Sequence, residues 1–262
     1  MLVVIKGAGD LATGIAYRLK RCGFNIVMTE INKPTTVRRT VAFSQAIFDG
    51  EIEIEGIKGI KVKERNEIYN EIKKGNIPIV VDEEATIISI LKPKVVVDAI
   101  IAKENLGTTI DDAPIVVGVG PGFEAQKDCH LVVETKRGHY LGKVIENGSA
   151  IPNTGVPGEI GGYTTERIIR ATAKGKIKPI VSIGDFVKKG QVVAYIDEIE
   201  VLAKIDGIVR GILQEGIDVF KGMKSGDIDP RCERNHCFTI SDKARAIGGG
   251  VLEAIMYMNE KL

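Results

Sequence analysis

The first thirty residues contain the pattern that most constrains the fold. An apolar run at residues 2–5 is followed by a Gly-Ala-Gly turn at residues 7–9, and a helical stretch then continues to Cys22. A second apolar run ends at Glu30. A strand, a glycine turn, a helix, a strand and an acidic residue, in that order, are typical of a dinucleotide-binding βαβ unit. We therefore predict an α/β fold with a parallel sheet.

Each part of this pattern has a physical role in binding a nucleotide. Gly7 permits a tight turn after the strand, and Gly9 lets a pyrophosphate approach the backbone. The N–H groups at the start of the helix attract phosphate, and Glu30 lies where a carboxylate accepts hydrogen bonds from a ribose diol. The alternative to nucleotide binding is that the glycine turn serves only tight packing and that its pocket is empty. The predicted cofactor-binding residues of this unit are Gly7, Gly9, Asp10, Ala12, Thr13 and Glu30.

Composition excludes several classes of protein. The 262 residues are 44% hydrophobic and 27% charged, with a net charge of +1. This balance gives no electrostatic reason to bind nucleic acid or an acidic membrane, and no apolar stretch has the length of a membrane span. Four cysteines are too few for a disulfide framework in a chain of this length. We expect a cytoplasmic homo-oligomer that binds neither nucleic acid nor membrane.

Strand and helix patterns alternate through the first part of the chain. Continuous runs of β-branched residues indicate parallel strands that are covered on both faces. The first part is therefore predicted to be a Rossmann-like, doubly wound α/β domain over residues 1–165. Further helices are expected near residues 37–48, 64–74 and 84–91, and further strands near residues 51–54, 57–62, 78–81, 94–98, 114–118 and 131–134.

The second part contains an internal repeat, in which residues 171–196 match residues 203–228 at a spacing of 32. Glycines of the two copies coincide at expected turns, and aliphatic residues coincide at expected strands. Neither copy is long enough to bury a face alone, so the two are expected to close on each other. The repeat resembles the biotinyl/lipoyl-type barrel-sandwich hybrid, and we assign this module to residues 166–230.

The repeat differs from carrier domains of that type at the functional position. Carrier domains present a modified lysine on a hairpin between the two halves, whereas the connection here, residues 197–202, contains no lysine. Lys204 lies too close to the following strand to serve. We therefore expect no covalent biotin or lipoate, and interpret the module as an unmodified one for docking or assembly.

The remaining segment, residues 231–262, is expected to pack back on the core as a helix from about Asp242 to Met258. The run Gly248-Gly249-Gly250 weakens a helix, so it predicts close approach to a neighbouring backbone or a ligand. Cys232, His236 and Cys237 are residue types that bind zinc. Adjacent residues cannot both bind without strain, and no second cysteine pair exists, so no metal site is predicted.

Polar residues and glycines between the two parts supply candidates for chemistry. Gly118, Gly120 and Gly122 follow an expected strand at the edge where open α/β sheets place ligands, so we predict that they contact a cofactor. Strand alternation would place His130 and Glu134 on one side, a pairing suited to proton transfer or, with Arg137, to anion binding. A polar edge with a solvated turn is the alternative. The candidate catalytic residues are Lys103, His130 and His139.

Several stretches together resemble one family over nearly the whole chain. The chain is similar to the YqeB-type accessory proteins of selenium-dependent molybdenum hydroxylase systems. The resemblance implies a maturation pathway, with a hydroxylase subunit as a partner, and transfers no catalytic residue. The stretches that carry it are Lys6–Gly14, Arg38–Phe43, Gly118–Phe123, Val133–His139, Pro152–Gly155 and Ser241–Gly250.

The leading hypothesis is therefore an accessory protein that binds a nucleotide-bearing small molecule. The ligand would be NAD or a dinucleotide form of the molybdenum cofactor, and Arg38 or Arg39 would pair with further ligand charge. Two alternatives remain open: an NAD-dependent oxidoreductase, and a ligand-sensing or scaffolding protein.

Overall fold

The computed structural model describes all 262 residues, which form two compact units. Unit 1 comprises residues 1–34, 42–154 and 240–262, and unit 2 comprises residues 35–41 and 155–239. The expected boundary at residue 165 falls inside unit 2. The expected C-terminal segment divides between the units, because residues 231–239 belong to unit 2 and residues 240–262 to unit 1.

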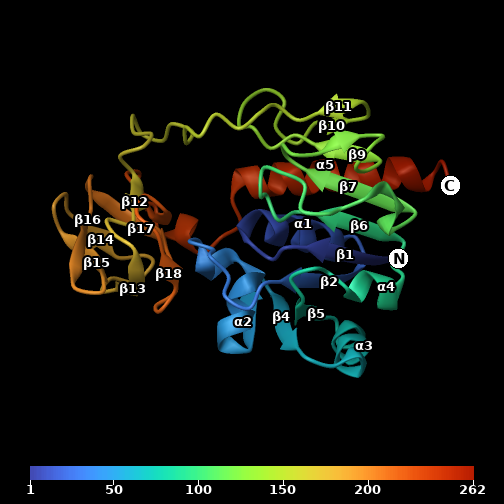
Figure 1. Cartoon of the computed structure of the whole chain (residues 1–262), viewed down its shortest axis with the longest axis horizontal. Coiled ribbons are helices and arrows are strands. Elements are labelled where there is room, and N and C mark those ends of the chain that lie inside the picture. Colours follow the sequence, from blue (N-terminus) through green and yellow to red (C-terminus); the bar gives the residue numbers. More distant parts are fainter. The chain divides into compact units, whose positions relative to one another are not determined.

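Unit 1 is built on a nine-stranded, mostly parallel sheet with the order β10-β9-β7-β6-β1-β2-β5-β4-β3 (Figure 1). From β4 to β9 all neighbouring strands run parallel, and the antiparallel strands β3 and β10 form the edges. The direction of strand addition reverses at β1, since β2 and β5 follow on one side and β6, β7 and β9 on the other. The strands are β1 (Leu2–Lys6), β2 (Asn25–Glu30), β3 (Glu51–Ile54), β4 (Ile57–Val62), β5 (Ile77–Val81), β6 (Val95–Asp98), β7 (Ile115–Val119), β9 (Leu131–Val133) and β10 (Val144–Ile145). A separate two-stranded sheet pairs β8 (Glu124–Ala125) with β11 (Gly148–Ser149).

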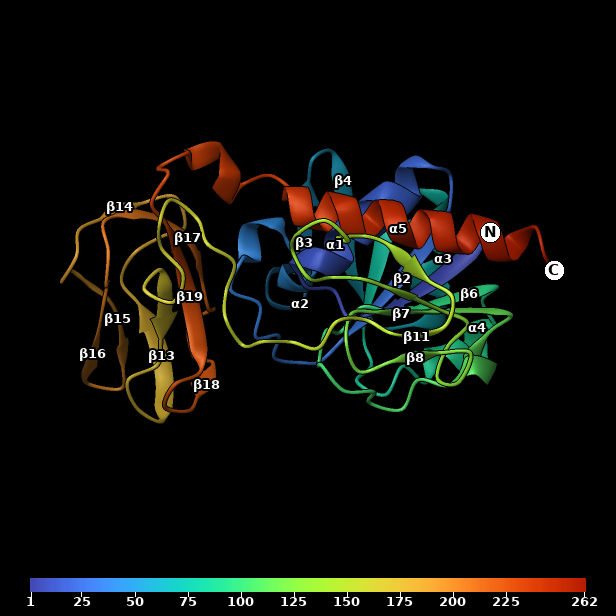
Figure 2. The same cartoon turned by 90° about the horizontal axis from the view of Figure 1, so that it is seen from above.

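Helices cover both faces of this sheet. The helices α1 (Asp10–Arg21) and α5 (Asp242–Asn259) lie side by side over one face, as Figure 2 shows. The other face is covered by α3 (Arg65–Lys73) and α4 (Ile87–Leu91). The mixed α/β class, the mostly parallel sheet and the C-terminal helix are as the sequence predicts. No helix combines the length and apolar character that a membrane span requires.

Small residues let α1 and α5 approach closely. A Cβ atom built on Gly14 would lie 2.6 Å from the Cβ atom of Ala244, and one on Gly248 would lie 2.8 Å from the carbonyl oxygen of Gly14. A Cβ atom on Gly250 would collide with the backbone of Gly142, whereas one on Gly249 would meet nothing within 4 Å. The prediction that the glycine run packs against a neighbouring backbone is confirmed for two of its three positions.

Two expected helices are shorter than the sequence indicates. The region expected as one helix over residues 37–48 forms the 3-10 turns η1 (Arg39–Val41) and η2 (Phe43–Gln45) and the short helix α2 (Ala46–Asp49). The chain passes between the two units after Val41, and extended backbone at Ala42 prevents a continuous helix. The helix expected over residues 84–91 begins only at Ile87, because Ala85 adopts a positive φ of 54°.

Unit 2 consists of two four-stranded antiparallel sheets, with the orders β12-β19-β17-β14 and β16-β15-β13-β18 (Figure 2). The strands β12 and β16 directly precede the two copies of the repeat at the same spacing of 32 residues. With these strands included, the first copy corresponds to β12 to β15 and the second to β16 to β19. Exchanging equivalent strands converts one sheet order into the other, so each sheet takes two strands from each copy. The strands are β12 (Ile168–Arg170), β13 (Gly175–Pro179), β14 (Phe186–Val187), β15 (Val192–Ile196), β16 (Ile199–Leu202), β17 (Gly207–Ile212), β18 (Asp218–Val219) and β19 (Lys224–Asp229), with the 3-10 turn η4 (Arg234–Cys237) after them.

Equivalent residues of the two copies also share their conformation and bonding. Gly190 and Gly222 have φ angles of +84° and +88°. The Gly190 N–H donates to the Ala203 carbonyl and the Gly222 N–H donates to the Ala171 carbonyl, each over 2.8 Å. The internal repeat read from the sequence is therefore a structural repeat, and its copies close on each other as expected.

Candidate functional site

The glycine turn lies at the carboxyl end of β1, where the direction of strand addition reverses. In open parallel sheets the ligand crevice lies at this point. Gly7 has a φ of +90°, which favours glycine, and its N–H donates to the Thr29 carbonyl over 2.9 Å. Gly9 is the N-cap of α1 and has no side chain to cover the N–H groups of the first turn. The turn thus leads directly into the amino end of α1 without a side chain at the N-cap position.

Glu30 already uses one N–H group of this turn. Its Oε2 atom accepts a hydrogen bond from the Ala8 N–H over 3.0 Å, and its Oε1 atom accepts one from the Ile31 N–H over 2.9 Å. Burial raises the pKa of Glu30 above its ordinary value, while the two N–H donors act in the opposite direction. The structure therefore brings Glu30 to the glycine turn, as predicted, with its carboxylate turned toward the protein's own backbone.

Thr13 is fully buried and bonded within the protein. Its hydroxyl accepts a hydrogen bond from the Phe43 N–H over 2.9 Å and donates to the Ala8 carbonyl over 3.4 Å. The Ser44 N–H also donates to the Ala8 carbonyl, over 2.8 Å. These bonds fasten η2 to the glycine turn, so the geometry gives Thr13 a positioning role and does not support the predicted contact with phosphate. Asp10 begins α1 and adds a negative charge beside the turn. Ala12, a predicted cofactor-binding residue, is fully buried, and its small side chain lets α1 pack closely on the strands.

A buried polar cluster beside this turn was not predicted from the sequence. Lys6 and Asp98 end β1 and β6 and are register partners across the two strands. The Lys6 Nζ atom lies 3.5 Å from Asp98 Oδ2 and donates to the Thr108 hydroxyl over 2.5 Å, and that hydroxyl donates to Asp98 Oδ2 over 2.6 Å. All three residues are buried. The sequence does contain a signal for this cluster, because a charged residue ends each of these two apolar strands.

The three glycines after β7 pack against the chain itself. An added Cβ atom would lie 2.6 Å from Phe123 at Gly118, 2.8 Å from the Thr135 hydroxyl at Gly120, and 2.7 Å from the Glu104 Cα atom at Gly122. Gly120 and Gly122 also have φ angles of +87° and +111°. These contacts account for glycine at the three positions, and cofactor binding by them remains a prediction.

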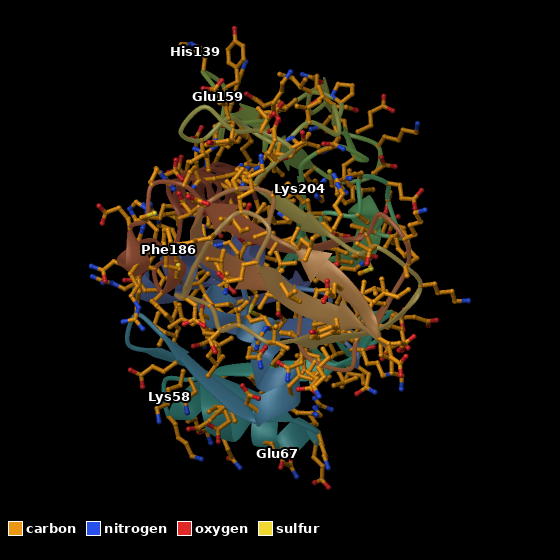
Figure 3. All side chains as sticks on the ribbon, turned by 90° about the vertical axis from the view of Figure 1, so that its left-hand side faces the viewer. Lys58, Glu67, His139, Glu159, Phe186 and Lys204 are labelled. Carbon is orange, nitrogen blue, oxygen red and sulfur yellow. The ribbon has the colours of Figure 1, made fainter.

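The three candidate catalytic residues do not converge. Lys103 is exposed in the loop after β6. His139 is exposed beside Tyr140, with ring centroids 4.9 Å apart, and projects outward in Figure 3. His130 precedes β9, at the amino ends of the parallel strands, whereas the glycine turn lies at their carboxyl ends. No hydrogen bond or ion pair joins any two of them.

The predicted pairing of His130 with Glu134 is wrong. These residues flank the three-residue strand β9, and four steps of extended chain place their Cα atoms about 13 Å apart. The Glu134 carboxylate instead accepts hydrogen bonds from the N–H groups of Thr135, Lys136 and Ile151, over 2.6 to 2.8 Å. Arg137, predicted to bind an anion together with this pair, forms a bidentate ion pair with Asp242.

His130 is bonded to the backbone of the neighbouring strand and lines a cavity of about 1000 Å³. Its Nδ1 atom accepts a hydrogen bond from the Val116 N–H over 3.0 Å, an arrangement that requires the neutral ring. Burial lowers the pKa of His130, although the nearby Asp111 carboxylate acts in the opposite direction. Asp111 and Lys92 line the same cavity.

We expect the stability contributed by His130 to decrease as the pH falls. A lowered pKa means that the unfolded chain binds a proton more readily, so the contribution is present above the unfolded pKa near 6.5 and is lost below it. His130→Gln does not titrate in this range. The difference in stability between wild type and this variant should change by less than about 1 kcal/mol between pH 7.5 and 5.5, because the ring is partly solvated. Urea unfolding at several pH values measures this, and a difference that grows in favour of wild type at low pH would contradict it.

The structure offers no ready metal centre. No three His, Cys, Asp or Glu side chains are placed to hold a metal ion. The Cys237 thiol is buried against the Val209 carbonyl, and burial raises its pKa, whereas Cys232 is exposed.

The hairpin between β15 and β16 turns at Asp197 and Glu198.

These features define a mixed α/β protein whose candidate site is a glycine turn at the centre of a mostly parallel sheet. No known family profile matches the chain. It is 53% identical, over 257 residues that cover 98% of its length, to the uncharacterized protein YqeB of Escherichia coli (strain K12). The chain spans about half of that relative, 48% of its length.

Two solved structures show weak similarity. A succinylglutamate desuccinylase from Silicibacter sp. TM1040 is 10% identical, with a TM-score of 0.26 over 87% of this chain and 84% of that one. A succinylglutamate desuccinylase/aspartoacylase from Rhodobacter sphaeroides is 21% identical, with a TM-score of 0.22 over 24% of this chain and 21% of that one. Scores this low support no argument about fold or activity.

Proposed function

We propose that unit 1 is a Rossmann-type domain that binds a nucleotide-bearing ligand at its glycine turn. The observation that supports this most is the order of six of the seven parallel strands, β5-β2-β1-β6-β7-β9, which is third, second, first, fourth, fifth and sixth along that series. The seventh parallel strand, β4, lies beyond β5 and precedes it in the chain. Dinucleotide-binding domains have this order and bind their ligand where it reverses. The glycine turn lies at the reversal, and Glu30 ends the strand next to it.

Glu30 gives the proposed site a coupled mechanism of binding. The carboxylate accepts the Ala8 N–H in the structure described above. A ribose diol offers two hydroxyl donors, so its arrival would draw Glu30 away from the turn and release the Ala8 N–H to a phosphate oxygen. One side chain would thus link recognition of the sugar to recognition of the phosphate.

The resemblance to accessory proteins of selenium-dependent molybdenum hydroxylase systems supplies the biological context of the proposal. NAD and a dinucleotide form of the molybdenum cofactor both carry the ribose and pyrophosphate that this site suits. The three candidate catalytic residues do not lie together at the glycine turn. A role in handling such a ligand during hydroxylase maturation, without a reaction at this site, agrees with that arrangement. An NAD-dependent oxidoreductase is the second candidate, since the same strand order serves hydride-transferring enzymes.

Unit 2 is proposed to be an unmodified barrel-sandwich module that docks a hydroxylase subunit. Its two interleaved sheets support the assignment, and the hairpin at Asp197 and Glu198 presents acidic residues where a carrier would present lysine. Exposed aromatic side chains on this unit, Phe186 and Phe220, suit contact with another protein. Phe186 is labelled in Figure 3.

Thermal unfolding with a panel of NAD, NADP, and cytidine and guanosine nucleotides tests the nucleotide site. A ligand at a hundred times its Kd raises the free energy of unfolding by about 2.7 kcal/mol, which is a clear shift in Tm. Gly9→Asp should abolish the shift, because a carboxylate at the N-cap repels and replaces the phosphate. The ligand-free Tm should stay the same or rise slightly, since aspartate is a favourable N-cap.

Asp10→Asn is the matched control. It removes a negative charge next to the turn and leaves Gly9 in place, so it should keep the ligand-induced shift and tighten binding of the anion. If no nucleotide of the panel raises the Tm of the wild-type chain, the proposed site is wrong. A persistent lack of absorbance change at the nicotinamide band, with NAD bound and a range of reduced substrates supplied as hydride donors, would argue against the oxidoreductase alternative.

A further inference from the structure

The two copies of the repeat in unit 2 differ clearly at one pair of equivalent charged residues. Lys178 on β13 is exposed, and it pairs regularly with Tyr195 on β15. Its counterpart, Arg210 on β17, lies at an irregularity in the pairing with β19, where the register shifts between Val209 and Gly211. Such a bulge redirects a side chain. Arg210 is 9% exposed, so the second copy has buried a charge that the first copy leaves in water.

The buried Arg210 guanidinium has no hydrogen bond within the protein. Its nearest acidic atom is Asp229 Oδ2, which lies 3.8 Å from Nη1, and its Nε atom is buried without a partner. A guanidinium carries five N–H donors, and an isolated buried charge with unbonded donors is strongly unfavourable. A ligand with several acceptor oxygens would remove this penalty.

Neighbouring carboxylates are engaged by other arginines. Asp229 accepts hydrogen bonds from Arg231, from Nε over 2.9 Å and from Nη2 over 2.6 Å. Asp227 forms a short ion pair with Arg167, which also donates to the Gly158 carbonyl over 3.1 Å. Both carboxylates therefore hydrogen-bond to other arginines, and Arg210 retains only the longer ion pair with Asp229, at 3.8 Å.

Arg38 adds a further positive charge to this region. It is buried, and its Nη2 atom donates to the carbonyls of His236 and Thr239 over 3.0 and 3.1 Å. Burial and the Arg38 charge lower the pKa of Arg210, against the effect of the two carboxylates. Six charged residues of this region, four arginines and two aspartates, together carry an excess of two positive charges: Arg38, Arg167, Arg210, Arg231, Asp227 and Asp229.

We infer that Arg210 anchors a binding site for a phosphate-type oxyanion on the β17–β19 face of unit 2. A phosphate dianion matches the excess of two positive charges, and its oxygens match the N–H donors that the protein leaves unbonded. The site is separate from the glycine turn and does not depend on the function proposed for unit 1. Its ligand is inorganic phosphate or the phosphate group of a small phosphate ester.

The test measures binding of inorganic phosphate by the full chain with the Gly9→Asp substitution, which removes the other candidate phosphate site. Thermal unfolding and titration calorimetry are carried out against chloride at equal ionic strength. Saturable stabilisation by phosphate is expected. Arg210→Met should weaken phosphate binding at least tenfold, whereas Lys178→Met, at the equivalent position of the first copy, should change it less than twofold.

Arg210→Met should remain folded without phosphate, because it removes a buried guanidinium whose Nε atom has no partner and keeps an apolar stem of similar length. Arg210→Gln provides a second variant with the same expected loss of binding. Ribose 5-phosphate identifies the source of the anion: tighter binding than inorganic phosphate indicates an ester, and weaker binding indicates the free ion. Absence of saturable phosphate binding, or equal binding by wild type and both Arg210 variants, would overturn the inference.

Discussion

Gly248→Ala should lower the free energy of unfolding by about 2–3 kcal/mol, as overpacking at a rigid contact does. The new Cβ atom would lie 2.8 Å from the carbonyl oxygen of Gly14 on α1, and backbone at a helix crossing cannot move aside as a flexible side chain can. Urea unfolding followed by far-ultraviolet circular dichroism measures the change.

Gly249→Ala is the matched control for this prediction. It adds the same methyl group one residue further along α5, where an added Cβ atom meets nothing within 4 Å. Replacing a helical glycine by alanine in open space should raise the free energy of unfolding by about 0.5–1 kcal/mol. The two neighbouring substitutions therefore have opposite expected signs, and equal effects would contradict the close crossing of α1 and α5.

Lys6→Met should lower the free energy of unfolding by about 3–5 kcal/mol, because it leaves Asp98 charged and buried. The Thr108 hydroxyl and the Ile100 N–H continue to donate to Asp98, over 2.6 and 3.2 Å, but neither neutralises it. The loss should be measured by urea unfolding at neutral pH.

The double substitution Lys6→Met with Asp98→Asn controls for the loss of lysine itself. It removes both charges and retains an amide oxygen that accepts from Thr108. We expect it to recover a large part of the stability that Lys6→Met loses, since pairs in direct contact are not additive. Additive losses would show that the two charges do not depend on each other.

Local sequence patterns predicted those elements whose ends are set by neighbouring residues. The strand, turn, helix and strand of residues 2–30 occur as predicted. α5 begins at Asp242, directly after Ser241, which caps the helix by accepting a hydrogen bond from the Ala244 N–H. The repeat was equally visible, because its glycines mark turns that recur every 32 residues.

The errors arose where distant parts of the chain decide the structure. Residues 37–48 have a helical pattern, but the passage from one unit to the other divides them. Alternation suggested a partner for His130, yet the strand after it is only three residues long. The importance of Lys6 and Asp98 depends on their strands being neighbours, and that of Arg210 on a bulge, neither of which a single sequence reveals.

The division of the chain between its two units has a consequence for synthesis on the ribosome. Residues 155–239 are made before α5, the last element of unit 1, although α5 packs on α1 at the beginning of the chain. The small-residue face of α1 therefore stays uncovered during synthesis until α5, residues 242–259, has emerged from the ribosome. Termination of synthesis before residue 240 would yield a chain that contains all of unit 2 but lacks α5 of unit 1. We expect proteases to degrade such a chain.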